Sequence, residues 1–429
     1  MRHFTNIVLG GGVSSGYFAR EWVKHKGPHN SLAIISGDKY VSYERPALSK
    51  GYLAPKNPAR LPKFHTCVGD GGELQAPSWY KDHGIEFLTE TTIKEADLAK
   101  KTLTSDKGDI FTYDKLVIAT GARPTKLEDF KMSGSSLQGV AYIRDVEDAD
   151  RLLESVARAR AGSQRAVIIG GGYIGMEVGA GLAEHELKVT LVFPESRLME
   201  RLLTPELASF YETYYADKGV SLRKGLTVKE VLSRDGAVTG VRLSDGSQME
   251  ADLVVVGIGA RANTELFQDQ LEMMDKPLGG IRVGPQLQTS ATDVYAMGDV
   301  AAFDNGEAGW MRQEHVTNAR LMGQFAAAQL LGKARDEAYS YLPFFYSREF
   351  TLSWQFYGQS KGEAVHWDQE KGKKFGAYWV DGGRVVGAFL EGGQPEENAA
   401  IAKAVKSKAK VESTTSLEKQ GLGFAQNLA

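Results

Sequence analysis

Two stretches of the chain repeat one design, and this duplication constrains the fold more than any other feature. The stretches read NIVLGGGVSSGYFAREWVK (6–24) and RAVIIGGGYIGMEVGAGLAE (165–184). Each has a β-branched run, a cluster of glycines and a helical segment, and a second apolar run follows each of them (32–36 and 189–193). A strand, a tight turn, a helix and a parallel strand are the opening of a dinucleotide-binding fold. The sequence therefore predicts two such folds in one chain.

A second pair of matching segments supports the duplication. YDKLVIATGARPT (113–125) aligns with ADLVVVGIGARANT (251–264), and each follows charged, alternating segments that we interpret as antiparallel strands. After about residue 325 the chain changes to aromatic, alternating strands and then a helix, which is typical of an α+β domain. We expect an α/β protein with two Rossmann-like domains and a C-terminal α+β domain. The expected bounds are 1–140 with 266–325 for the first domain, 141–265 for the second and 326–429 for the third.

The glycine clusters have the spacing that a nucleotide pyrophosphate requires. They read Gly10-x-Gly12-x-x-Ser15 and Gly170-x-Gly172-x-x-Gly175. The first glycine permits the tight turn, the second lets a pyrophosphate approach the backbone, and a small third residue lets helix and strand pack. The helix N-terminus then offers N–H groups and a positive dipole end to the phosphates. A glycine-rich turn without a ligand is the alternative interpretation, but the strand–turn–helix context at both places favours two nucleotide sites.

An acidic residue follows each second strand, displaced by a residue or two from the position that usually holds a ribose hydroxyl. We assign Asp38 to the first nucleotide and Glu195 to the second. An exposed loop acid is the alternative for each of them. Glu195 in place disfavours a 2′-phosphate and hence favours NADH over NADPH, although Arg197 and Arg201 lie close enough in sequence to weaken that preference.

Composition and charge exclude several functional classes. The chain has 429 residues, a net charge of −3 and a single cysteine, Cys67. The balanced charge does not indicate nucleic acid or an anionic membrane as a partner. No apolar run approaches the roughly 20 residues that a membrane span needs. One cysteine cannot form an internal disulfide or a redox pair, which fits a reducing compartment. With no leader-like segment and no peroxisomal tripeptide in the sequence, we expect a cytoplasmic protein, and we assign no metal ligands.

The order of these parts resembles the two-dinucleotide flavoprotein reductases over nearly the whole chain. ATG (119–121) is similar to the segment that closes the FAD domain in that family, and VYAMGDVA (294–301) resembles the segment that returns to the flavin. The resemblance implies that the first cluster binds FAD, with Asp299 on the ribitol. It implies that the second cluster binds NADH, with NADPH less favoured.

The branches of this family differ in what accepts the electrons. Disulfide reductases need a C-x4-C pair after the second strand, where this chain reads SYERPALSKGYL (42–53) without cysteine. That run is similar to the branch that holds ferredoxin and rubredoxin reductases and monodehydroascorbate reductase, which implies that Arg45 and Lys50 lie along the flavin and its phosphates. YIRDVEDAD (142–150) resembles the segment whose arginine, here Arg144, touches the FAD.

The expected nucleotide-binding residues can now be collected. For FAD they are Gly10, Gly12, Val13, Ser14, Ser15, Asp38, Arg45, Lys50, Ala119, Thr120, Gly121, Arg144 and Asp299. For NAD they are Gly170, Gly172, Tyr173, Ile174, Gly175, Glu177, Glu195, Arg201 and Gly259.

Several stretches resemble plant-type monodehydroascorbate reductases rather than ferredoxin reductases, most densely in the last third of the chain. They include RLPKFHTCVGDGGE (60–73), EHVTNAR (314–320), YLPFFYSREF (341–350), WQFYG (354–358) and FGAYW with GAFLEGG (375–393). The resemblance implies two catalytic, substrate-binding residues, Arg320 on the anionic ring oxygens of the ascorbyl radical and Tyr346 as an electron conduit. The alternatives are a solvated helix arginine for Arg320 and plain core packing for Tyr346.

Cys67 does not qualify as a nucleophile on this sequence. His65 lies two positions away, where the side chains of an extended segment point apart, and no second cysteine can resolve an intermediate. The resemblance implies that Cys67 and Gly69 line the pocket in which ascorbate docks. His315 is a weaker substrate-site candidate, and a satisfied buried histidine is its alternative.

The resemblance implies an FAD-dependent oxidoreductase that takes a hydride from NADH and reduces monodehydroascorbate radicals to ascorbate by successive one-electron transfers. One rival is an NADH-dependent ferredoxin- or rubredoxin-type reductase, which would need a charged docking face. The other is a slowly turning FAD- and NADH-binding sensor similar to apoptosis-inducing factor, against which the lack of a long inserted regulatory loop counts. We expect a monomer or weak homodimer that has no nucleic-acid or membrane partner.

Overall fold

The chain gathers into two compact units. The computed structural model describes residues 1–66, 72–334, 336–368 and 372–428. The first unit comprises Met1–Ala47, Ala59–Arg123 and Ala260–Tyr341, and the second comprises Leu48–Pro58, Pro124–Gly259 and Leu342–Ala429. The division into three domains therefore stays a prediction about smaller parts of these units. None of the helices in the described residues is both long enough and apolar enough to cross a membrane.

A mixed sheet forms the centre of the first unit. Its strand order is β3-β2-β1-β6-β5-β4, and β18 pairs in parallel with the end of β6. The β3, β2, β1 and β6 strands run parallel, whereas β5 and β4 continue the sheet as an antiparallel meander. The bounds are β1 (Arg2–Leu9), β2 (Leu32–Ile35), β3 (Ile85–Leu88), β4 (Ile93–Asp97), β5 (Thr102–Ser105), β6 (Ile110–Ile118) and β18 (Val294–Ala296).

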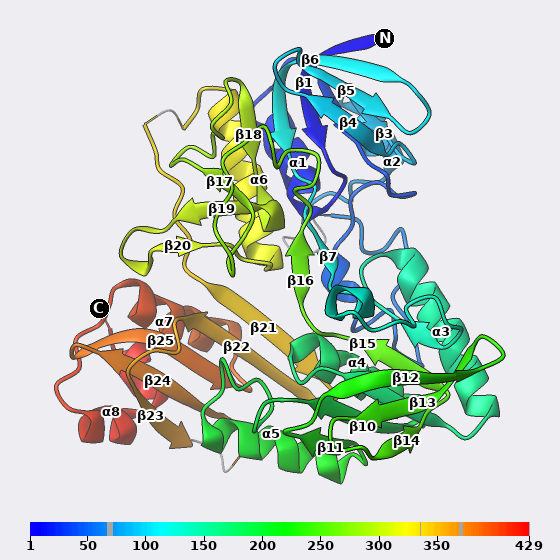
Figure 1. The fold of residues 1–429 in the computed structure, drawn as a ribbon. Helices are drawn as coiled ribbons and strands as arrows, with labels where there is room; N and C mark the ends of the chain where they lie inside the picture. The colour runs from blue at the N-terminus through cyan, green and yellow to red at the C-terminus, as the bar shows by residue number, and fades with distance from the viewer. Residues whose placement is uncertain (67–71, 335, 369–371, 429) are drawn as a thin grey trace. The chain divides into compact units, whose positions relative to one another are not determined.

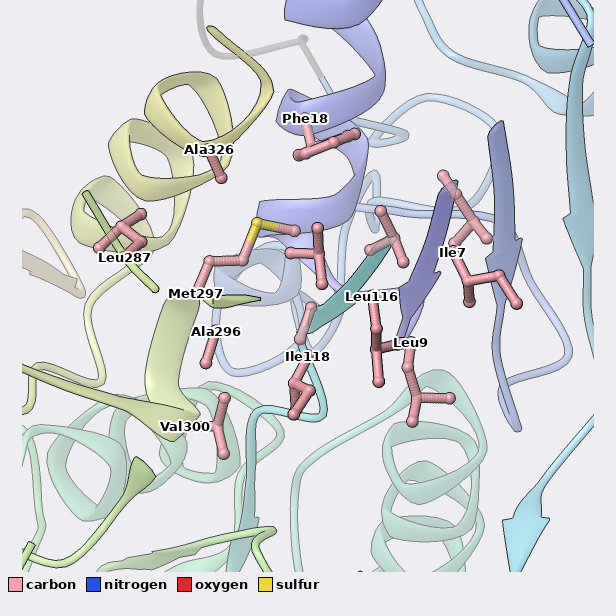
Figure 2. Close-up of a cluster of buried hydrophobic side chains, with 14 of the residues drawn as sticks. Ile7, Leu9, Phe18, Leu116, Ile118, Leu287, Ala296, Met297, Val300 and Ala326 are labelled. Atoms are coloured by element: carbon pink, nitrogen blue, oxygen red, sulfur yellow. The ribbon is translucent and has the colours of Figure 1, made fainter. Parts of the chain in front are cut away.

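Helices α1 (Val13–Lys24) and α6 (Val316–Leu330) lie side by side against this sheet (Figure 1). Residues 6–9 of β1 are all buried, as expected for a parallel strand that is covered on both faces. Figure 2 shows the resulting core, in which side chains such as Ile7, Phe18, Ile118 and Met297 converge from β1, α1, β6 and the end of β18. This core holds the carboxyl ends of β1 and β6 in place beside the start of α1.

Smaller elements complete the first unit. They are α2 (Pro77–Asp82), β17 (Ile281–Val283), β19 (Ala301–Asp304), β20 (Trp310–Met311) and the 3-10 turns η1 (Arg45–Ala47), η4 (Gly298–Val300) and η5 (Gly306–Ala308). The chain leaves this unit through β7 (Ala122–Pro124) and returns through β16 (Ala260–Ala262).

The second unit begins with a parallel sheet of order β11-β10-β9-β15-β8. The strands are β8 (Val140–Ala141), β9 (Arg165–Ile169), β10 (Lys188–Phe193), β11 (Ser221–Lys224) and β15 (Leu253–Val256). The helices of this part are α3 (Val146–Ala161), α4 (Tyr173–Glu184) and α5 (Pro205–Asp217), with a 3-10 turn η3 (Leu127–Phe130). An antiparallel meander joins β12 (Val228–Arg234), β13 (Ala237–Leu243) and β14 (Gln248–Glu250).

The last part of the second unit is an antiparallel sheet of order β21-β22-β25-β24-β23, with short helices after it. The strands are β21 (Phe344–Glu349), β22 (Leu352–Gly358), β23 (Glu363–Asp368), β24 (Phe375–Asp381) and β25 (Arg384–Glu391). The helices are α7 (Pro395–Lys406), α8 (Thr414–Gln420) and α9 (Leu422–Gln426). One apolar core joins this sheet to α4 and α5, through Trp354, Phe389, Met176 and Tyr215.

The expected fold class is confirmed. Two strand–turn–helix–strand units occur at the two glycine clusters, each within a parallel sheet, and the C-terminal part is an α+β arrangement. The predicted antiparallel segments before residues 113 and 251 are the β4-β5-β6 and β12-β13-β14 meanders.

Candidate functional site

The first glycine turn lies where β1, β2 and β6 end together. Gly10 has a φ of +121°, and a Cβ added there would lie 2.1 Å from the carbonyl oxygen of Ala119. The Gly10 N–H donates to the Ile35 carbonyl at 2.8 Å, and the Ala119 N–H donates to the Leu9 carbonyl at 2.8 Å. Because a side chain would collide with the neighbouring backbone, the turn requires glycine at this position.

The start of α1 is open to an anion. Gly12 caps the helix without a side-chain hydrogen bond, and a Cβ added to Gly12 would meet no heavy atom of the described chain within 4 Å. The buried Ser15 hydroxyl donates to the Gly10 carbonyl at 2.5 Å, so the serine that replaces the usual glycine or alanine fastens the turn. Free N–H groups, a positive helix end and open space next to Gly12 together fit a nucleotide pyrophosphate.

Several other predicted residues of the first nucleotide site gather in the same unit. Gly298 packs so closely against Ser14 that an added Cβ would lie 2.7 Å from the Ser14 Oγ, which brings Asp299 next to the start of α1. Asp38 accepts a hydrogen bond from the Arg45 Nη2 at 2.9 Å, so the predicted ribose acid is held by a predicted flavin-contacting arginine.

The ATG segment is fastened to the chain that returns from the second unit. The Thr120 Oγ1 donates to the Asn263 carbonyl at 2.7 Å, and the Asn263 Nδ2 donates to the Thr120 carbonyl at 2.8 Å. The Asn263 N–H donates to the Gly121 carbonyl at 2.9 Å. These bonds fix the loop that follows β6 at the carboxyl edge of the sheet, where ligands of parallel sheets bind.

The second glycine turn has the geometry of the first. Gly170 has a φ of +128°, and an added Cβ would lie 2.2 Å from the carbonyl oxygen of Gly257. Gly172 caps α4 with no side-chain bond, and space is open around it in the described residues. A Cβ at Gly175 would lie 2.3 Å from the Gly170 carbonyl, so glycine is needed there. The second cluster therefore fits a pyrophosphate by the same physical features as the first.

The acid and the arginines expected near the second nucleotide have different environments. Glu195 is half-buried after β10, and its carbonyl accepts the Gly225 N–H at 3.1 Å. The Arg197 Nη1 bonds the Glu200 Oε1 at 3.1 Å and is therefore occupied, whereas the Arg201 side chain is exposed. Tyr173 and Ile174 open α4, and Ile174 is 37% exposed.

Glu177, expected at the NAD site, is buried and forms an ion pair with Lys50. Its side chain is 1% exposed, its Oε2 lies 2.7 Å from the Lys50 Nζ, and the hydroxyls of Ser49 and Ser347 donate to its two oxygens at 2.5 Å each. The Lys50 ammonium also lies 5.8 Å from the centre of the Tyr346 ring. The second unit thus joins three predicted site residues, Lys50, Glu177 and Tyr346, in one network.

Arg320 on α6 is not a freely solvated arginine. Its Nη2 lies 2.8 Å from the Glu44 Oε2, and its guanidinium stands 5.3 Å from the centre of the Tyr17 ring. The Tyr17 hydroxyl donates to the other Glu44 oxygen at 2.9 Å. His315 precedes α6 as its N-cap, and burial lowers the pKa of its imidazole to about 4, so it is neutral at pH 7.

Other predicted site residues are Arg144, Gly259, Cys67 and Gly69. Arg144 is half-buried before α3 in the second unit, and the Gly259 carbonyl accepts the Thr125 N–H at 2.9 Å. Cys67 and Gly69 lie outside the described residues. Among the residues that are described, no group of three or more His, Cys, Asp or Glu side chains could hold a metal ion.

Comparison with known proteins decides the family. The family model "Pyridine nucleotide-disulphide oxidoreductase" matches residues 4–323, and the model "Monodehydroascorbate reductase 3-like, C-terminal domain" matches residues 342–425. The monodehydroascorbate reductase of Pisum sativum is 48% identical over 435 residues, covering 99% of both chains. The chain belongs to the monodehydroascorbate reductase family.

Relatives in this family come from more than one compartment. The cytosolic monodehydroascorbate reductase 4 of rice (Oryza sativa subsp. japonica) is 48% identical and covers 99% of this chain and 98% of its own. The peroxisomal monodehydroascorbate reductase 2 of rice is 50% identical over 99% of this chain and 89% of its own length.

Solved structures share the fold at lower identity. A ferredoxin reductase from Rhodopseudomonas palustris is 27% identical, with a TM-score of 0.85 and coverage of 98% of this chain and 99% of that one. The reductase in a covalent complex with putidaredoxin is 26% identical, with a TM-score of 0.86 and full coverage of both chains. The expected identity as a flavoprotein oxidoreductase of the monodehydroascorbate reductase family is confirmed, and the family implies a flavin and a pyridine nucleotide.

Sequence reasoning missed the partners of the predicted residues. Glu44 pairs with Arg320, and Ser49 and Ser347 complete the surroundings of Glu177. The alternation of side chains along β21 contained one usable signal. Ser347 and Glu349 share a face of this strand with Phe345 and are buried, and polar residues are unusual on such a face, so a buried polar partner could have been expected there.

Substitutions at Gly10 and Gly12 should distinguish the contribution of the first turn to stability from its contribution to nucleotide binding. Gly10→Ala places a methyl against the Ala119 carbonyl at a strained φ, so we expect a loss of about 2 kcal/mol or more in the free energy of unfolding. Gly12→Ala has an ordinary φ of −76° and open space, so stability should change by less than about 0.5 kcal/mol. Its methyl would enter the open space in which we expect the pyrophosphate, so flavin affinity should fall at least roughly tenfold.

Urea unfolding of the flavin-free proteins and fluorescence titration with flavin measure the two effects. A Gly12→Ala protein that binds flavin as tightly as the wild type would contradict the placement of the phosphates at this turn.

Proposed function

We propose that the chain is an NADH-dependent monodehydroascorbate reductase that holds FAD. The observation that carries the proposal is the continuity of the family match through the C-terminal part, residues 342–425, where acceptor specificity should lie. The presence of one cysteine in the whole chain supports it as well, because reduction of a disulfide through a cysteine pair needs two. The alternative electron acceptor is a small iron–sulfur carrier, favoured by the likeness to a ferredoxin reductase and to the reductase of the putidaredoxin complex.

The two glycine turns are the proposed cofactor sites. The turn at Gly10 and Gly12 would hold the FAD pyrophosphate, with Asp38 on the adenosine ribose and Asp299 on the ribitol. The turn at Gly170 and Gly172 would hold the NADH pyrophosphate. When bound, the flavin supplies what no side chain can, since it accepts two electrons together as a hydride and releases them singly.

Arg320 is the proposed anchor of the acceptor. The ascorbyl radical is an anion with neighbouring ring oxygens, and the planar guanidinium offers parallel N–H donors to such a pair. The bond to Glu44 and the ring of Tyr17 hold the guanidinium at the start of α6 with its side chain 20% exposed. Arg320 therefore needs little reordering to bind an anion, which lowers the entropic cost of binding.

Tyr346 is the proposed electron conduit, and the ammonium of Lys50, which is paired with Glu177, stands 5.8 Å from the centre of its ring. Its ring also stacks with Phe344, with centroids 6.0 Å apart.

The nucleotide preference is assigned to Glu195. A carboxylate there accepts the ribose hydroxyls of NADH and repels the 2′-phosphate of NADPH. Arg197 is occupied by Glu200, so only the exposed Arg201 is left to offset that repulsion. NADH should therefore be preferred, with some use of NADPH. We extend the proposal to a cytoplasmic monomer or weak homodimer, in line with the cytosolic rice relative.

NADH oxidation by the purified protein tests the function. Ascorbyl radical is generated in situ from ascorbate with an ascorbate oxidase, and ferredoxin with a cytochrome reporter is run in parallel. We expect rapid radical-dependent oxidation of NADH, slower oxidation of NADPH and little ferredoxin activity. Fast ferredoxin reduction with no response to the radical would replace the proposed acceptor by a protein partner.

Replacing Arg320 tests its role as the anchor. In Arg320→Ala the turnover with the radical should fall roughly tenfold to a hundredfold, because one charge-assisted donor pair is lost. Reduction of the flavin by NADH should stay within about twofold of the wild type, since the nucleotide sites are untouched.

Stopped-flow absorbance separates the two half-reactions. The exposed Arg348 on β21 provides the matched control, and Arg348→Ala should behave as the wild type in both. Slowed flavin reduction in Arg320→Ala would show that the assigned role is wrong.

A further inference from the structure

Arg312 is a mostly buried arginine of the first unit that lies outside both glycine turns. It follows β20, and the antiparallel pairing of β19 with β20 brings it back beside η4, the turn that carries Asp299. Its side chain is 12% exposed. An arginine that is removed from water to this extent needs partners for its charge and for its N–H groups. The identity of those partners therefore shows what Arg312 holds together.

Three acceptors from three segments surround the Arg312 guanidinium. Its Nε donates to the Leu278 carbonyl at 2.9 Å, and its Nη1 donates to the Asp299 carbonyl at 3.1 Å. The same Nη1 donates to the Glu314 Oε1 at 2.6 Å. Leu278 precedes β17, Asp299 lies in η4 and Glu314 precedes α6. One side chain thus joins three segments of the first unit through charge-assisted bonds, which are stronger than bonds between neutral groups.

Gly280 provides the space in which the Arg312 side chain lies. Gly280 has a φ of +94°, and a Cβ added to it would lie 2.7 Å from the Arg312 Cδ and 2.8 Å from the Val300 carbonyl oxygen. Val300 is the last residue of η4. A side chain at residue 280 would therefore push the arginine away from the turn, and the close approach requires glycine.

The backbone of η4 is fixed at successive residues. The Gly298 N–H donates to the Met322 Sδ on α6 at 3.3 Å, and the next residue, Asp299, gives its carbonyl to Arg312. That carbonyl belongs to the peptide plane that joins Asp299 to Val300. The bond from Arg312 therefore fixes the backbone rotation about the Cα–C bond of Asp299, and the carboxylate keeps only the rotations of its own side chain.

We propose that Arg312 is a positioning residue for the flavin, because it fixes the turn from which the Asp299 carboxylate would bind the ribitol of FAD. This inference rests on the proposed function, in which Asp299 has that role. Arg312 acts through Asp299 and not by its own contact with the cofactor. A carboxylate whose backbone is already fixed loses little conformational freedom on binding, so the affinity for FAD is higher than it would be with a loose turn.

Four variants test the proposal. Arg312→Met keeps the length of the side chain without its donors, and Arg312→Lys keeps the charge and a donor group. Asp299→Ala removes the carboxylate through which Arg312 acts. Arg282→Met is the matched control, because Arg282 lies on β17 of the same unit, is 51% exposed and has an ion pair with Glu272 at 3.7 Å.

The first readout is the binding of FAD to the flavin-free proteins, followed by fluorescence. In Arg312→Met the affinity for FAD should fall roughly tenfold to a hundredfold, because the turn loses its charged donor. Arg312→Lys should lose only about threefold to tenfold, since an ammonium can replace part of the guanidinium contacts. Arg282→Met should stay within about twofold of the wild type.

The second readout distinguishes positioning from a general loss of structure. ADP contains the adenosine and the pyrophosphate of FAD but no ribitol, so its inhibition constant against FAD binding reports the turn at Gly10 and Gly12 alone. This constant should stay within about twofold of the wild type in Arg312→Met, because that turn is held by its own backbone bonds. Equal weakening of ADP and FAD would overturn the proposal. If Arg312→Met yields no folded protein, Arg312→Lys decides by the same comparison.

The third readout asks whether Arg312 acts through Asp299. Asp299→Ala alone should weaken FAD binding. In that background the further loss caused by Arg312→Met should shrink to less than about twofold, because residues that act through one contact are not additive. An equal loss from Arg312→Met in both backgrounds would overturn the proposal.

The outcomes separate this proposal from the proposed function. An Arg312→Met protein that binds FAD as tightly as the wild type would overturn the role of Arg312 and leave the reductase function intact. A wild type that binds FAD but oxidises no NADH with the radical would overturn the function, while the comparison of FAD with ADP would still report whether Arg312 positions Asp299.

Discussion

At Gly10 and again at Gly170, the backbone passes so close to a carbonyl oxygen just after the end of a neighbouring strand that no side chain fits. Both residues also have a positive φ, which favours glycine. Each close approach fixes where a strand becomes a helix, and it therefore fixes the uncapped helix start that faces the open space at Gly12 or Gly172. The nucleotide-binding character of the chain follows from this one steric requirement, met twice.

Helix α4 contributes both to the second glycine turn and to the ion pair with Lys50, because successive side chains of a helix point in different directions. Its N-cap Gly172 and its first residues, Tyr173 and Ile174, lie at the glycine turn, whereas Glu177, about one turn further along, is buried and pairs with Lys50. A helix that repeats every 3.6 residues brings such positions to different surroundings within a few residues. The proposed pyridine-nucleotide site and the Lys50–Glu177 pair thus share one helix.

The fold could be predicted from the sequence because its signals are local. The glycine spacing, the β-branched runs and the alternating segments each fall within about 20 residues. The partners of the functional side chains could not be predicted, because they are far apart in the chain: Arg320 lies 276 residues from Glu44, and Glu177 lies 128 residues from Ser49. The acid at Glu349 was visible as a charged residue on a buried strand face, but its lack of a partner depends on how α4, α5 and β25 surround it.

The central claim is that electrons from one nicotinamide leave the protein singly to a small radical anion. Electron paramagnetic resonance measures it directly, by counting ascorbyl radicals consumed for each NADH oxidised after correction for spontaneous radical decay. The account predicts a ratio of two. A ratio near zero, with NADH consumed only when a protein carrier such as ferredoxin is added, would contradict it.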